Sequence, residues 1–314
     1  MIIGVTGSGG FIGEKLVNSL LDCGHSVRIL TRKVSRSNSY HVNLEIVIGD
    51  LCNKTSLDGF VEGLNIVIHC AAEIRDESAM YYTNVIGTKN LIEKSKYKIQ
   101  QWIQLSSTGV YGPCFEGIIT EESSYNAINL YEKTKLESDL LVINAGESNF
   151  FNYTIIRPTN VFGPTMRNQS LLQLISMIDT EKFFFIGSKN SIVNYIHVDN
   201  VVDSILMSIH NNNALNQIFN ISDSLLMKDF VFIIREVLNK KMIKLVIPKS
   251  IVYMLNWVLN FIYQSPLTVA RIKHLTNQAV YSNLKINEVL EYNNRKDIKE
   301  GIKELTNFYK NNQC

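Results

Sequence analysis

Short apolar runs alternate with segments of helical spacing through the first half of the chain, and this alternation restricts the fold more than any other feature. The runs are IIGV (2–5), SVRIL (26–30), LEIVIG (44–49), NIVIHCA (65–71), QWIQLSS (101–107) and YTIIRP (153–158). Such runs are typical of strands buried on both faces of a parallel sheet. Strands that alternate with helices indicate right-handed βαβ units. We therefore predict an α/β fold with a doubly wound parallel sheet.

A glycine-rich segment, VTGSGGFIG (5–13), follows the first predicted strand and precedes the first predicted helix. One glycine permits an unusual backbone angle at the turn, a second lets a pyrophosphate approach the main chain, and a third allows close packing of helix on strand. Amides at a helix N-terminus bind phosphate. A glycine triplet alone is weak evidence, but its position predicts a Rossmann-type dinucleotide site. The residues expected at the cofactor in this segment are Gly7, Ser8, Gly10, Phe11 and Ile12.

The regular alternation ends near Phe162, and this change suggests a second portion of the chain. Segment 191–212 shows one more strand and one more helix, and much of 223–314 has helical spacing. We predict a dinucleotide-binding Rossmann domain over residues 1–162, to which 191–212 returns. Segments 163–190 and 213–314 are predicted to form a smaller, mostly helical substrate-binding portion at the carboxyl edge of the sheet.

Composition argues against several other classes of protein. The 314 residues include 46% hydrophobic and 19% charged residues, and a formal net charge of +2 gives no reason to expect nucleic acid or an anionic membrane as a partner. The N-terminus lacks the features of a signal peptide, and the apolar stretch 251–263 is too short to cross a bilayer. The six histidines and five cysteines show no spacing typical of metal ligands. We expect a cytoplasmic protein without a metal, with Cys23 and Cys70 in its core.

The end of the second predicted strand, RILTRK, bears on the choice of cofactor. An acidic residue there would bind the ribose hydroxyls of adenosine and select NAD. Thr31 stands at this position, followed by Arg32, Lys33 and Arg36. Guanidinium groups bind a 2′-phosphate, whereas a carboxylate repels it. We predict that Thr31, Arg32 and Arg36 contact the cofactor and favour NADP(H), with NAD(H) as the alternative.

The third, fourth and fifth predicted strands also end in residues suited to a ligand. GDL (49–51) places Asp50 where it can accept a hydrogen bond from the adenine amino group. HCAAE (69–73) supplies two small residues, Ala71 and Ala72, that let a cofactor lie close. LSSTGVYG (105–112) places Ser107 at the carboxyl edge of the sheet, where open α/β sheets bind ligands.

Tyr131 and Lys135 lie four positions apart in YEKTK, so a helix would place them on one face. This pair alone is equally consistent with two amphipathic surface residues. A neighbouring cation favours the phenolate and brings its pKa down from ~10 towards the range that suits proton transfer at neutral pH. The remaining motifs decide in favour of chemistry.

Taken together, the motifs resemble the extended short-chain dehydrogenase/reductase family, in particular its NAD-dependent epimerase/dehydratase branch, which handles nucleotide sugars. They are TGSGGFIG, GDL, HCAAE, TNVIGTKNL, LSSTGVYG, YEKTK, IIRPTNVFGP and NYIHVDNVV, in the order of the family and over most of the chain. The resemblance implies that Tyr131 is the general acid/base, that Lys135 binds the nicotinamide ribose and lowers the tyrosine pKa, and that Ser107 hydrogen-bonds the reacting oxygen. The hydride comes from the cofactor.

The resemblance implies further roles. Leu51 and Pro158 would lie at the cofactor, the latter beside the nicotinamide. Asn84 and His197 would serve the packing of the protein rather than its chemistry. A homodimer would form through the long helices that flank the active-site strand, one of which carries Tyr131. The residues expected at the substrate are Glu73, Ser107, Thr108, Asn160 and Arg271.

The residues after Ser107 narrow the reaction. Family members that dehydrate or decarboxylate their sugar carry acidic residues there, and bifunctional epimerase–reductases carry a cysteine at the second position. Thr108 and Gly109 stand here instead, so the resemblance disfavours those three reactions. We predict reduction of a 4-keto nucleotide sugar, or the reverse oxidation. A nucleotide-sugar 4-epimerase is the alternative. Such epimerases keep NAD bound and carry the acidic residue at the end of the second strand, from which Thr31 departs.

Other substrates and roles remain open. Many epimerases have an arginine just before YIHV, where this chain has Val193 and Asn194, and Arg271 is then the candidate phosphate contact. The region IGSKNSIVNYIHVDN also resembles relatives of the hydroxysteroid dehydrogenases. A non-enzymatic NADP sensor is a further alternative, but such proteins lack the Ser–Tyr–Lys set that is intact in this chain.

Overall fold

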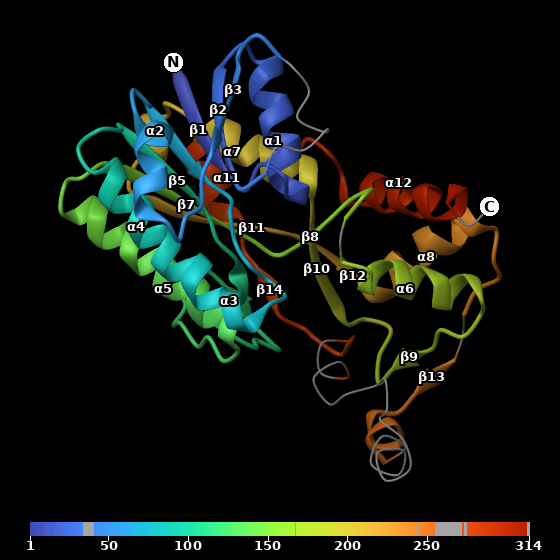
Figure 1. Cartoon of the computed structure of the whole chain (residues 1–314). Coiled ribbons are helices and arrows are strands. Elements are labelled where there is room, and N and C mark those ends of the chain that lie inside the picture. Colours follow the sequence, from blue (N-terminus) through green and yellow to red (C-terminus); the bar gives the residue numbers. More distant parts are fainter. Residues whose placement is uncertain (34–40, 167, 244, 255–271, 273–274, 313–314) are drawn as a thin grey trace.

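A seven-stranded sheet forms the centre of the computed structural model, which describes residues 1–33, 41–166, 168–243, 245–254, 272 and 275–312 (Figure 1). Its strand order is β11-β7-β5-β4-β1-β2-β3, and every neighbouring pair is parallel. The strands are β1 (Ile2–Thr6), β2 (Ser26–Thr31), β3 (Leu44–Ile48), β4 (Ile66–His69), β5 (Gln101–Leu105), β7 (Asn152–Pro158) and β11 (Gln217–Ile221). The six predicted strands and the doubly wound fold are thus confirmed.

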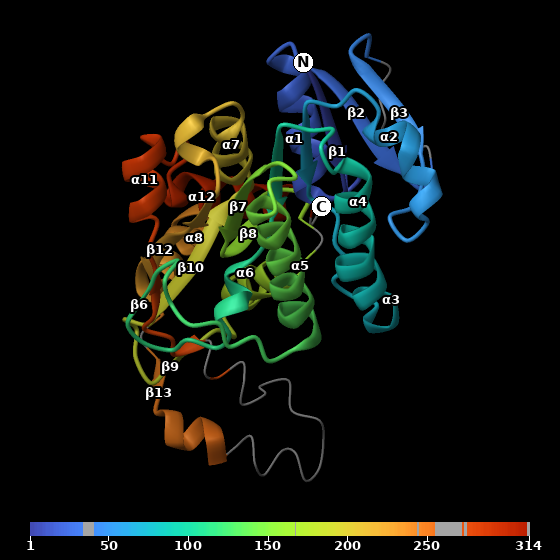
Figure 2. The same ribbon diagram turned by 90° about the vertical axis from the view of Figure 1, so that its left-hand side faces the viewer.

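Helices cover both faces of this sheet (Figures 1 and 2). One layer contains α1 (Phe11–Asp22), α7 (Val198–Ser208) and α11 (Leu284–Leu290), and the other contains α2 (Asp58–Val61), α4 (Gly87–Ser95) and α5 (Leu130–Glu147). Successive side chains of a strand point to opposite faces. On β4, Ile66 and Ile68 therefore join the core beneath α1 and α7, while Val67 joins the core beneath α4 and α5. This two-sided burial explains why the strands read as continuous apolar runs.

The connection before α4 is irregular. It consists of α3 (Glu77–Tyr81), η2 (Tyr82–Ile86), which is a π-helical turn, and then α4 itself. Short 3-10 turns form η1 (Lys54–Leu57), η3 (Thr108–Tyr111) and η4 (Asn212–Ala214).

A second core lies beside the carboxyl edge of the large sheet. It is built from a three-stranded sheet of order β12-β10-β8 and from α6 (Ser170–Asp179), α8 (Met227–Leu238) and α12 (Ile298–Asn311). The strands are β8 (Asn160–Phe162), β10 (Ile192–His197) and β12 (Asp223–Leu226). Two short parallel pairs join β9 (Phe185–Ile186) to β13 (Val246–Ile247), and β6 (Ile118–Ile119) to β14 (Val280–Tyr281).

The strand pairings differ from the expected domain boundaries in two places. β11 belongs to the large sheet because it pairs in parallel with β7, although it falls in the segment 213–314 assigned to substrate binding. Within segment 191–212, α7 packs on α1 beside the large sheet, but β10 pairs with β8 and β12. The functional division into two portions stays a prediction.

Two further expectations concern single segments. Cys23 is exposed just after α1, so its predicted place in the core is wrong, whereas Cys70 is partly buried. No helix within the described ranges is long and apolar enough to span a membrane. Most of the apolar stretch 251–263 lies outside those ranges.

Candidate active site

The glycine-rich turn brings three backbone segments into close contact. Gly7 has a φ of +73°, and a Cβ atom added to it would lie 2.6 Å from the backbone nitrogen of Ala71. A Cβ atom on Gly13 would lie 2.1 Å from the carbonyl oxygen of Gly7. Gly10 is the N-cap of α1 and offers no side chain to the first amides of the helix. This combination fits a dinucleotide, because the backbone approaches closely and the helix N-terminus faces the turn with its amides.

Three other residues of this segment were predicted to contact the cofactor, and two of them pack into the protein core. Phe11 packs against the second core, and Ile12 packs against the core of the large sheet. Ser8 is half-buried within the turn. The side chains of Phe11 and Ile12 are therefore used by the protein interior, and any contact they make with a cofactor would come from their backbone.

The expected adenosine end lies at the carboxyl ends of β2 and β3. The hydroxyl of Thr31 donates to the carbonyl of Lys33 over 2.8 Å, so it stabilises its own loop. Arg32 is exposed. Burial and the Asp50 carboxylate raise the pKa of the Cys52 thiol, while the charge of Arg32 lowers it. Arg36 lies outside the described residues.

Two residues near this end have structural partners. The Oδ1 atom of Asp50 accepts a hydrogen bond from the backbone nitrogen of Cys52 over 2.8 Å. Leu51 is buried against Gly87, where a Cβ atom would lie 2.8 Å from the Cβ of Leu51.

The chain after β4 is held by its own polar groups. The backbone nitrogen of Ala71 donates to the hydroxyl of Thr6 over 3.3 Å, which brings Ala71 and Ala72 beside the glycine turn. Glu73, expected at the substrate, accepts hydrogen bonds through Oε1 from the three backbone nitrogens that follow it. These bonds lower the pKa of its carboxyl. Asn84 exchanges hydrogen bonds with the backbone of Glu73, which fits the structural role expected for it.

The structure brings Ser107, Tyr131 and Lys135 together at the carboxyl end of β5. Ser107 has an extended backbone and caps η3, where its hydroxyl accepts a hydrogen bond from the Gly109 nitrogen over 3.1 Å. Tyr131 lies in the first turn of α5 and hydrogen-bonds Ser107. Lys135 lies one turn later, is buried, and donates to the carbonyl of Leu105 over 2.6 Å.

The electrostatics of this set differ from expectation. Burial raises the pKa of Tyr131 to about 12, and the charge of Asp139 raises it further against the lowering effect of the Ser107 hydrogen bond. Burial lowers the pKa of Lys135, while Asp139 and Cys70 raise it. Lys135 is not among the groups that shift the pKa of Tyr131 in this structure, so the lowering expected from this lysine stays a prediction. The phenol is desolvated, and the ammonium group is directed at the Leu105 carbonyl.

The residues after β7 lie at the same edge. Thr108 is buried and donates to the carbonyl of Pro158 over 3.3 Å, so its hydroxyl braces β7 against η3. Asn160 is exposed at the start of β8, and its amide donates to the carbonyl of Asn194 over 3.5 Å. Arg271 lies outside the described residues.

The segment before α7 is structural. Val193 and Asn194 are buried in the second core, where the amide of Asn194 donates to the carbonyl of Ala279 over 2.9 Å. Nδ1 of His197 accepts a hydrogen bond from the Asp199 nitrogen at the start of α7, and burial lowers the pKa of this histidine to about 4. His197 thus caps α7, and its expected structural role stays a prediction. The described part of the chain holds no group of three or more His, Cys, Asp or Glu residues that could bind a metal.

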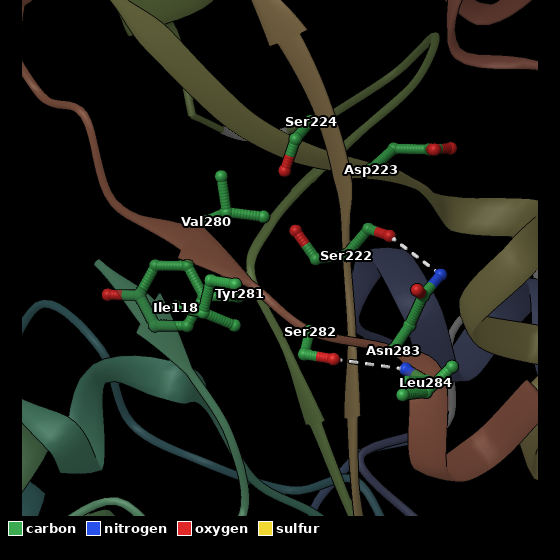
Figure 3. A pocket seen from close by; sticks show the side chains of 9 residues that line it. All are labelled: Ile118, Ser222, Asp223, Ser224, Val280, Tyr281, Ser282, Asn283 and Leu284. Atoms are coloured by element: carbon green, nitrogen blue, oxygen red, sulfur yellow. Dashed lines mark hydrogen bonds between the residues drawn. The ribbon is translucent and has the colours of Figure 1, made fainter. Parts of the chain in front are cut away.

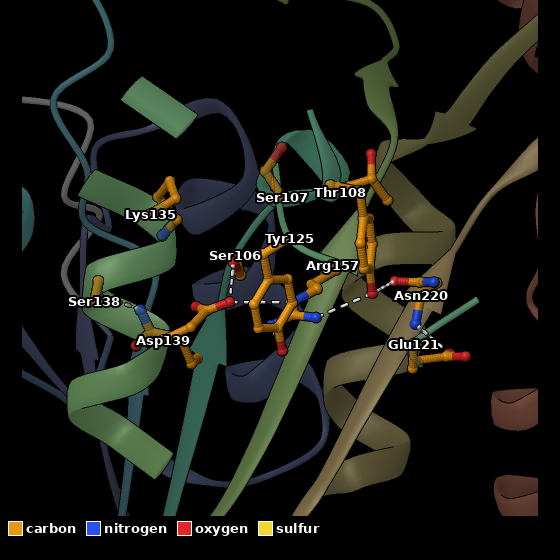
Figure 4. Close-up of polar contacts among 12 residues, drawn as sticks. Ser106, Ser107, Thr108, Glu121, Tyr125, Lys135, Ser138, Asp139, Arg157 and Asn220 are labelled. Carbon is orange, nitrogen blue, oxygen red and sulfur yellow. Dashed lines mark hydrogen bonds and ion pairs between the residues drawn. The ribbon is translucent and has the colours of Figure 1, made fainter. Parts of the chain in front are cut away.

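Two features of the site were not predicted from the sequence. Asp139 and Arg157 form a fully buried ion pair behind Ser107 and Lys135 (Figure 4). The signal was present, because Arg157 is a charge within the apolar run YTIIRP and Asp139 lies one helical turn beyond Lys135.

The second is a hollow of about 310 Å³ between the start of β12, β14 and the start of α11 (Figure 3). Burial raises the pKa of Asp223 in its wall to about 6. The hydroxyl of Thr159, the residue after β7, donates to the hydroxyl of Ser222 over 3.2 Å, which places the hollow near the end of β7. Its lining residues are Ile118, Ser222, Asp223, Ser224, Val280, Tyr281, Ser282, Asn283 and Leu284.

Known proteins resemble this chain in sequence. Human (Homo sapiens) sterol-4-alpha-carboxylate 3-dehydrogenase, decarboxylating, is 32% identical over 212 residues, which cover 63% of this chain and 54% of that protein. N-acetyl-alpha-D-glucosaminyl-diphospho-ditrans,octacis-undecaprenol 4-epimerase of Escherichia coli O157:H7 is 28% identical over 77% of this chain and 74% of that protein. The dTDP-glucose 4,6-dehydratase of Streptomyces niveus is 27% identical over 63% of this chain and 66% of its own length. The match thus spans little more than half the length of the sterol dehydrogenase.

Solved structures resemble it in fold. UDP-glucuronic acid 4-epimerase from Bacillus cereus, in complex with NAD, has a TM-score of 0.79 at 19% identity and covers 100% of both chains. The dTDP-glucose 4,6-dehydratase from Bacillus anthracis, in complex with NAD, has a TM-score of 0.77 at 20% identity over 100% of this chain and 97% of that one. The model of the NAD dependent epimerase/dehydratase family matches residues 3–222. Because this match covers more than half of the 314 residues, the chain belongs to the NAD dependent epimerase/dehydratase family.

Proposed function

We propose that this protein is an NAD(P)-dependent oxidoreductase that reduces the 4-keto group of a nucleotide sugar, or oxidises the corresponding hydroxyl. The observation that carries the proposal is the convergence of Ser107, Tyr131 and Lys135 at the carboxyl end of β5, on the same sheet edge as the glycine turn. A nicotinamide cofactor bound at the turn would supply or accept the hydride. Tyr131 would give a proton to the reacting oxygen or take one from it, and Ser107 would hold that oxygen in place.

The proposed preference for NADP(H) rests on the end of β2. Thr31 stands where an acidic residue would contact the ribose hydroxyls, and the exposed Arg32 follows it. Because this position holds no carboxylate, a 2′-phosphate would meet no repulsion there, and the guanidinium group of Arg32 would attract it. An exchangeable NADP(H) suits a reductase that consumes reducing equivalents.

The absence of an acid at the two positions after Ser107 supports hydride transfer without dehydration. Thr108 is engaged with the Pro158 carbonyl, and a Cβ atom on Gly109 would lie 3.1 Å from Cγ of Glu132. The carboxylate of Glu132 accepts hydrogen bonds from the backbone before α5, where it completes a capping box. A side chain at position 109 would therefore crowd the Glu132 side chain that caps α5.

A nucleotide-sugar 4-epimerase is the second candidate. It is favoured by the undecaprenol-linked sugar 4-epimerase among the relatives and by the UDP-glucuronic acid 4-epimerase among the solved structures. A hydroxysteroid-dehydrogenase-like activity is the third, because the sterol-4-alpha-carboxylate 3-dehydrogenases are similar to this chain. Val193 and Asn194 also favour this third candidate, because these buried residues offer no cation to the diphosphate of a nucleotide sugar.

The experiment that tests these alternatives is a substrate panel. The purified protein is incubated with 4-keto and 4-hydroxy nucleotide sugars and with 3-hydroxysteroids, with and without NADPH, while the absorbance of reduced nicotinamide is recorded. Net consumption of NADPH with a 4-keto sugar supports the reductase. Interconversion of C4 isomers without net consumption indicates the epimerase, and turnover of a steroid alone would overturn the sugar assignment.

The Tyr131→Phe variant separates an enzyme from a non-enzymatic NADP sensor. An enzyme should lose turnover and keep its affinity for NADPH, because the ring is preserved while the proton donor is lost. A protein that only senses the cofactor should respond to NADPH equally with and without this hydroxyl. Unchanged turnover in the variant would remove Tyr131 from the mechanism.

We also propose a cytoplasmic homodimer that forms through α3, η2 and α5. Tyr81, Tyr82 and Leu140 expose 41%, 62% and 42% of their surface on these elements, and the Tyr81 hydroxyl donates to Glu137 of α5 over 3.1 Å. A second copy of the chain would cover these side chains. Light scattering after gel filtration should give twice the mass of the chain, and Leu140→Glu should give a monomer.

A further inference from the structure

The buried ion pair behind the active site is poorly explained by stability. The Oδ2 atom of Asp139, on α5, lies 3.1 Å from Nε of Arg157, on β7, and neither side chain has exposed surface. Removing two charges from water costs about as much as their attraction returns, and apolar side chains often replace such pairs without loss of stability. The contacts of the pair indicate another role.

The pair holds the end of the strand that carries Ser107 (Figure 4). Oδ2 of Asp139 also accepts a hydrogen bond from the hydroxyl of Ser106 over 2.7 Å, and the backbone nitrogen of Ser106 donates to the carbonyl of Ile156 over 2.8 Å. Ser106 is thus fixed by both its side chain and its backbone. Neighbouring side chains of an extended chain point to opposite sides, so this fixation sets the direction of Ser107.

Arg157 holds the segment that follows Ser107. Its Nη1 donates to the hydroxyl of Tyr111 over 3.0 Å, and its Nη2 donates to the hydroxyl of Tyr125 over 3.1 Å. The Tyr111 hydroxyl in turn donates to Asn220, the fourth residue of β11, over 2.9 Å. The chain is therefore anchored on both sides of Ser107 by one charge network.

The pair also acts on Lys135 by its charge. Asp139 lies one turn after Lys135 on α5, and its carboxylate opposes the effect of burial, which lowers the lysine pKa. Three other titratable groups face Lys135. Cys70 also raises the pKa of the lysine, and Tyr131 lies on the preceding turn of α5. The third is His69, and burial together with the charge of Lys135 lowers the pKa of this histidine to about 3. Among these groups, only Asp139 is a carboxylate.

We propose that Asp139 is a positioning residue of the active site, which fixes the direction of Ser107 together with Arg157 and places a negative charge one helical turn from Lys135. Its kinetic consequences rest on the proposed oxidoreductase function. The positions of Ser106 and the following turn do not depend on any substrate.

Four variants separate position from charge. Asp139→Asn should lower kcat roughly 10- to 100-fold and move the alkaline limb of kcat/KM for reduction about one pH unit lower, since both Lys135 and Tyr131 then lose a proton more easily. Asp139→Glu keeps the charge and should restore the pH profile. Ser106→Ala should lower kcat without moving the profile. Asp203→Asn, on α7 in the other helix layer, is the matched control and should change neither.

Hydrogen–deuterium exchange of residues 105–112 tests the positions without a substrate. Exchange should rise in Asp139→Asn and in Ser106→Ala and stay at the wild-type level in Asp203→Asn. If the wild type turns over no compound of the panel, the proposed function fails, while this exchange and the pH dependence of NADPH affinity still decide the inference. Exchange and pH profile equal to those of the Asp203→Asn control would overturn it. If Asp139→Asn does not fold, unchanged exchange in Ser106→Ala overturns it.

Discussion

Gly7 provides the sharpest test of the phosphate turn, because its geometry leaves no room for a side chain. In Gly7→Ala the new Cβ would lie 2.6 Å from the Ala71 nitrogen and 2.7 Å from the Ala71 Cα and the Cys70 carbonyl carbon, all of them backbone atoms. A positive φ costs a residue with a Cβ about 1–2 kcal/mol. Forcing the backbone after β4 to move costs roughly 1–3 kcal/mol more. We expect a total loss of about 2–5 kcal/mol in the free energy of unfolding.

The assay is thermal unfolding without cofactor, so that the result depends on the turn alone. At ~2–4 °C per kcal/mol, the melting temperature of Gly7→Ala should fall by roughly 4–20 °C. Gly9→Ala is the matched control two residues away, since a Cβ there would meet no heavy atom within 4 Å, and its stability should change by less than about 0.5 kcal/mol. Equal melting temperatures for the two variants would refute the close approach of β1 to the chain after β4.

Three further variants probe the site and the core. Tyr131→Phe should lower kcat about 10²- to 10⁴-fold with little change in NADPH affinity, as measured by steady-state kinetics and fluorescence titration. Thr31→Asp should shift the ratio of NADPH to NADH affinity at least about tenfold towards NADH, and an unchanged ratio would remove β2 from cofactor selection. His69 is buried with its folded-state pKa lowered to about 3, so the unfolded state binds its proton first and stability falls as the pH drops below the usual value of 6.5. This contribution amounts to about 3 kcal/mol between pH 7 and pH 4, and His69→Gln should flatten the pH dependence of unfolding by that amount.

The sheet was predictable because its strands are buried on both faces. Ile66, Val67 and Ile68 point alternately into two cores, which produces a continuous apolar run with a recognisable length. β11 was not predicted, because QIFNI is a short edge strand that follows a helix and a loop with no glycine signal. Its place in the sheet depends on pairing with β7, more than 50 residues earlier in the chain.

The convergence of the candidate catalytic residues was predictable from their positions in the chain, but their electrostatics were not. Ser107 ends a strand and Tyr131 begins a helix, and the order of βαβ units is enough to bring those two ends to one edge. The direction of the Lys135 ammonium group depends on the Leu105 carbonyl. The burial of the Tyr131 phenol depends on all the segments that meet at this edge of the sheet. The contacts of Glu73 and Thr108 were not predictable for the same reason, since their polar groups bond to backbone atoms that sequence patterns do not specify.

The raised pKa of Tyr131 leads to a prediction about the direction of the reaction. With a pKa of about 12, the phenol is protonated throughout the neutral range and is ready to give a proton to an oxygen that gains charge during reduction. Oxidation needs the phenolate. As long as the pH is below that pKa, the phenolate population rises about tenfold for each unit by which the pH increases. We therefore expect kcat/KM for reduction to be flat from pH 6 to about pH 9, and kcat/KM for oxidation to rise about tenfold per unit over the same range.

Pre-steady-state rates in both directions, measured with the same sugar and cofactor pair, check this expectation. Tyr131→Phe serves as the control, because it should abolish the rising limb of the oxidation rate. An oxidation rate that levels off near pH 7 would show that the phenol titrates there in the working complex. Lys135 would then have to leave the Leu105 carbonyl and approach the phenol, since a cation at that distance is what lowers a tyrosine pKa so far. A protein with that behaviour would suit an epimerase, in which one tyrosine must both take and return the proton at similar rates.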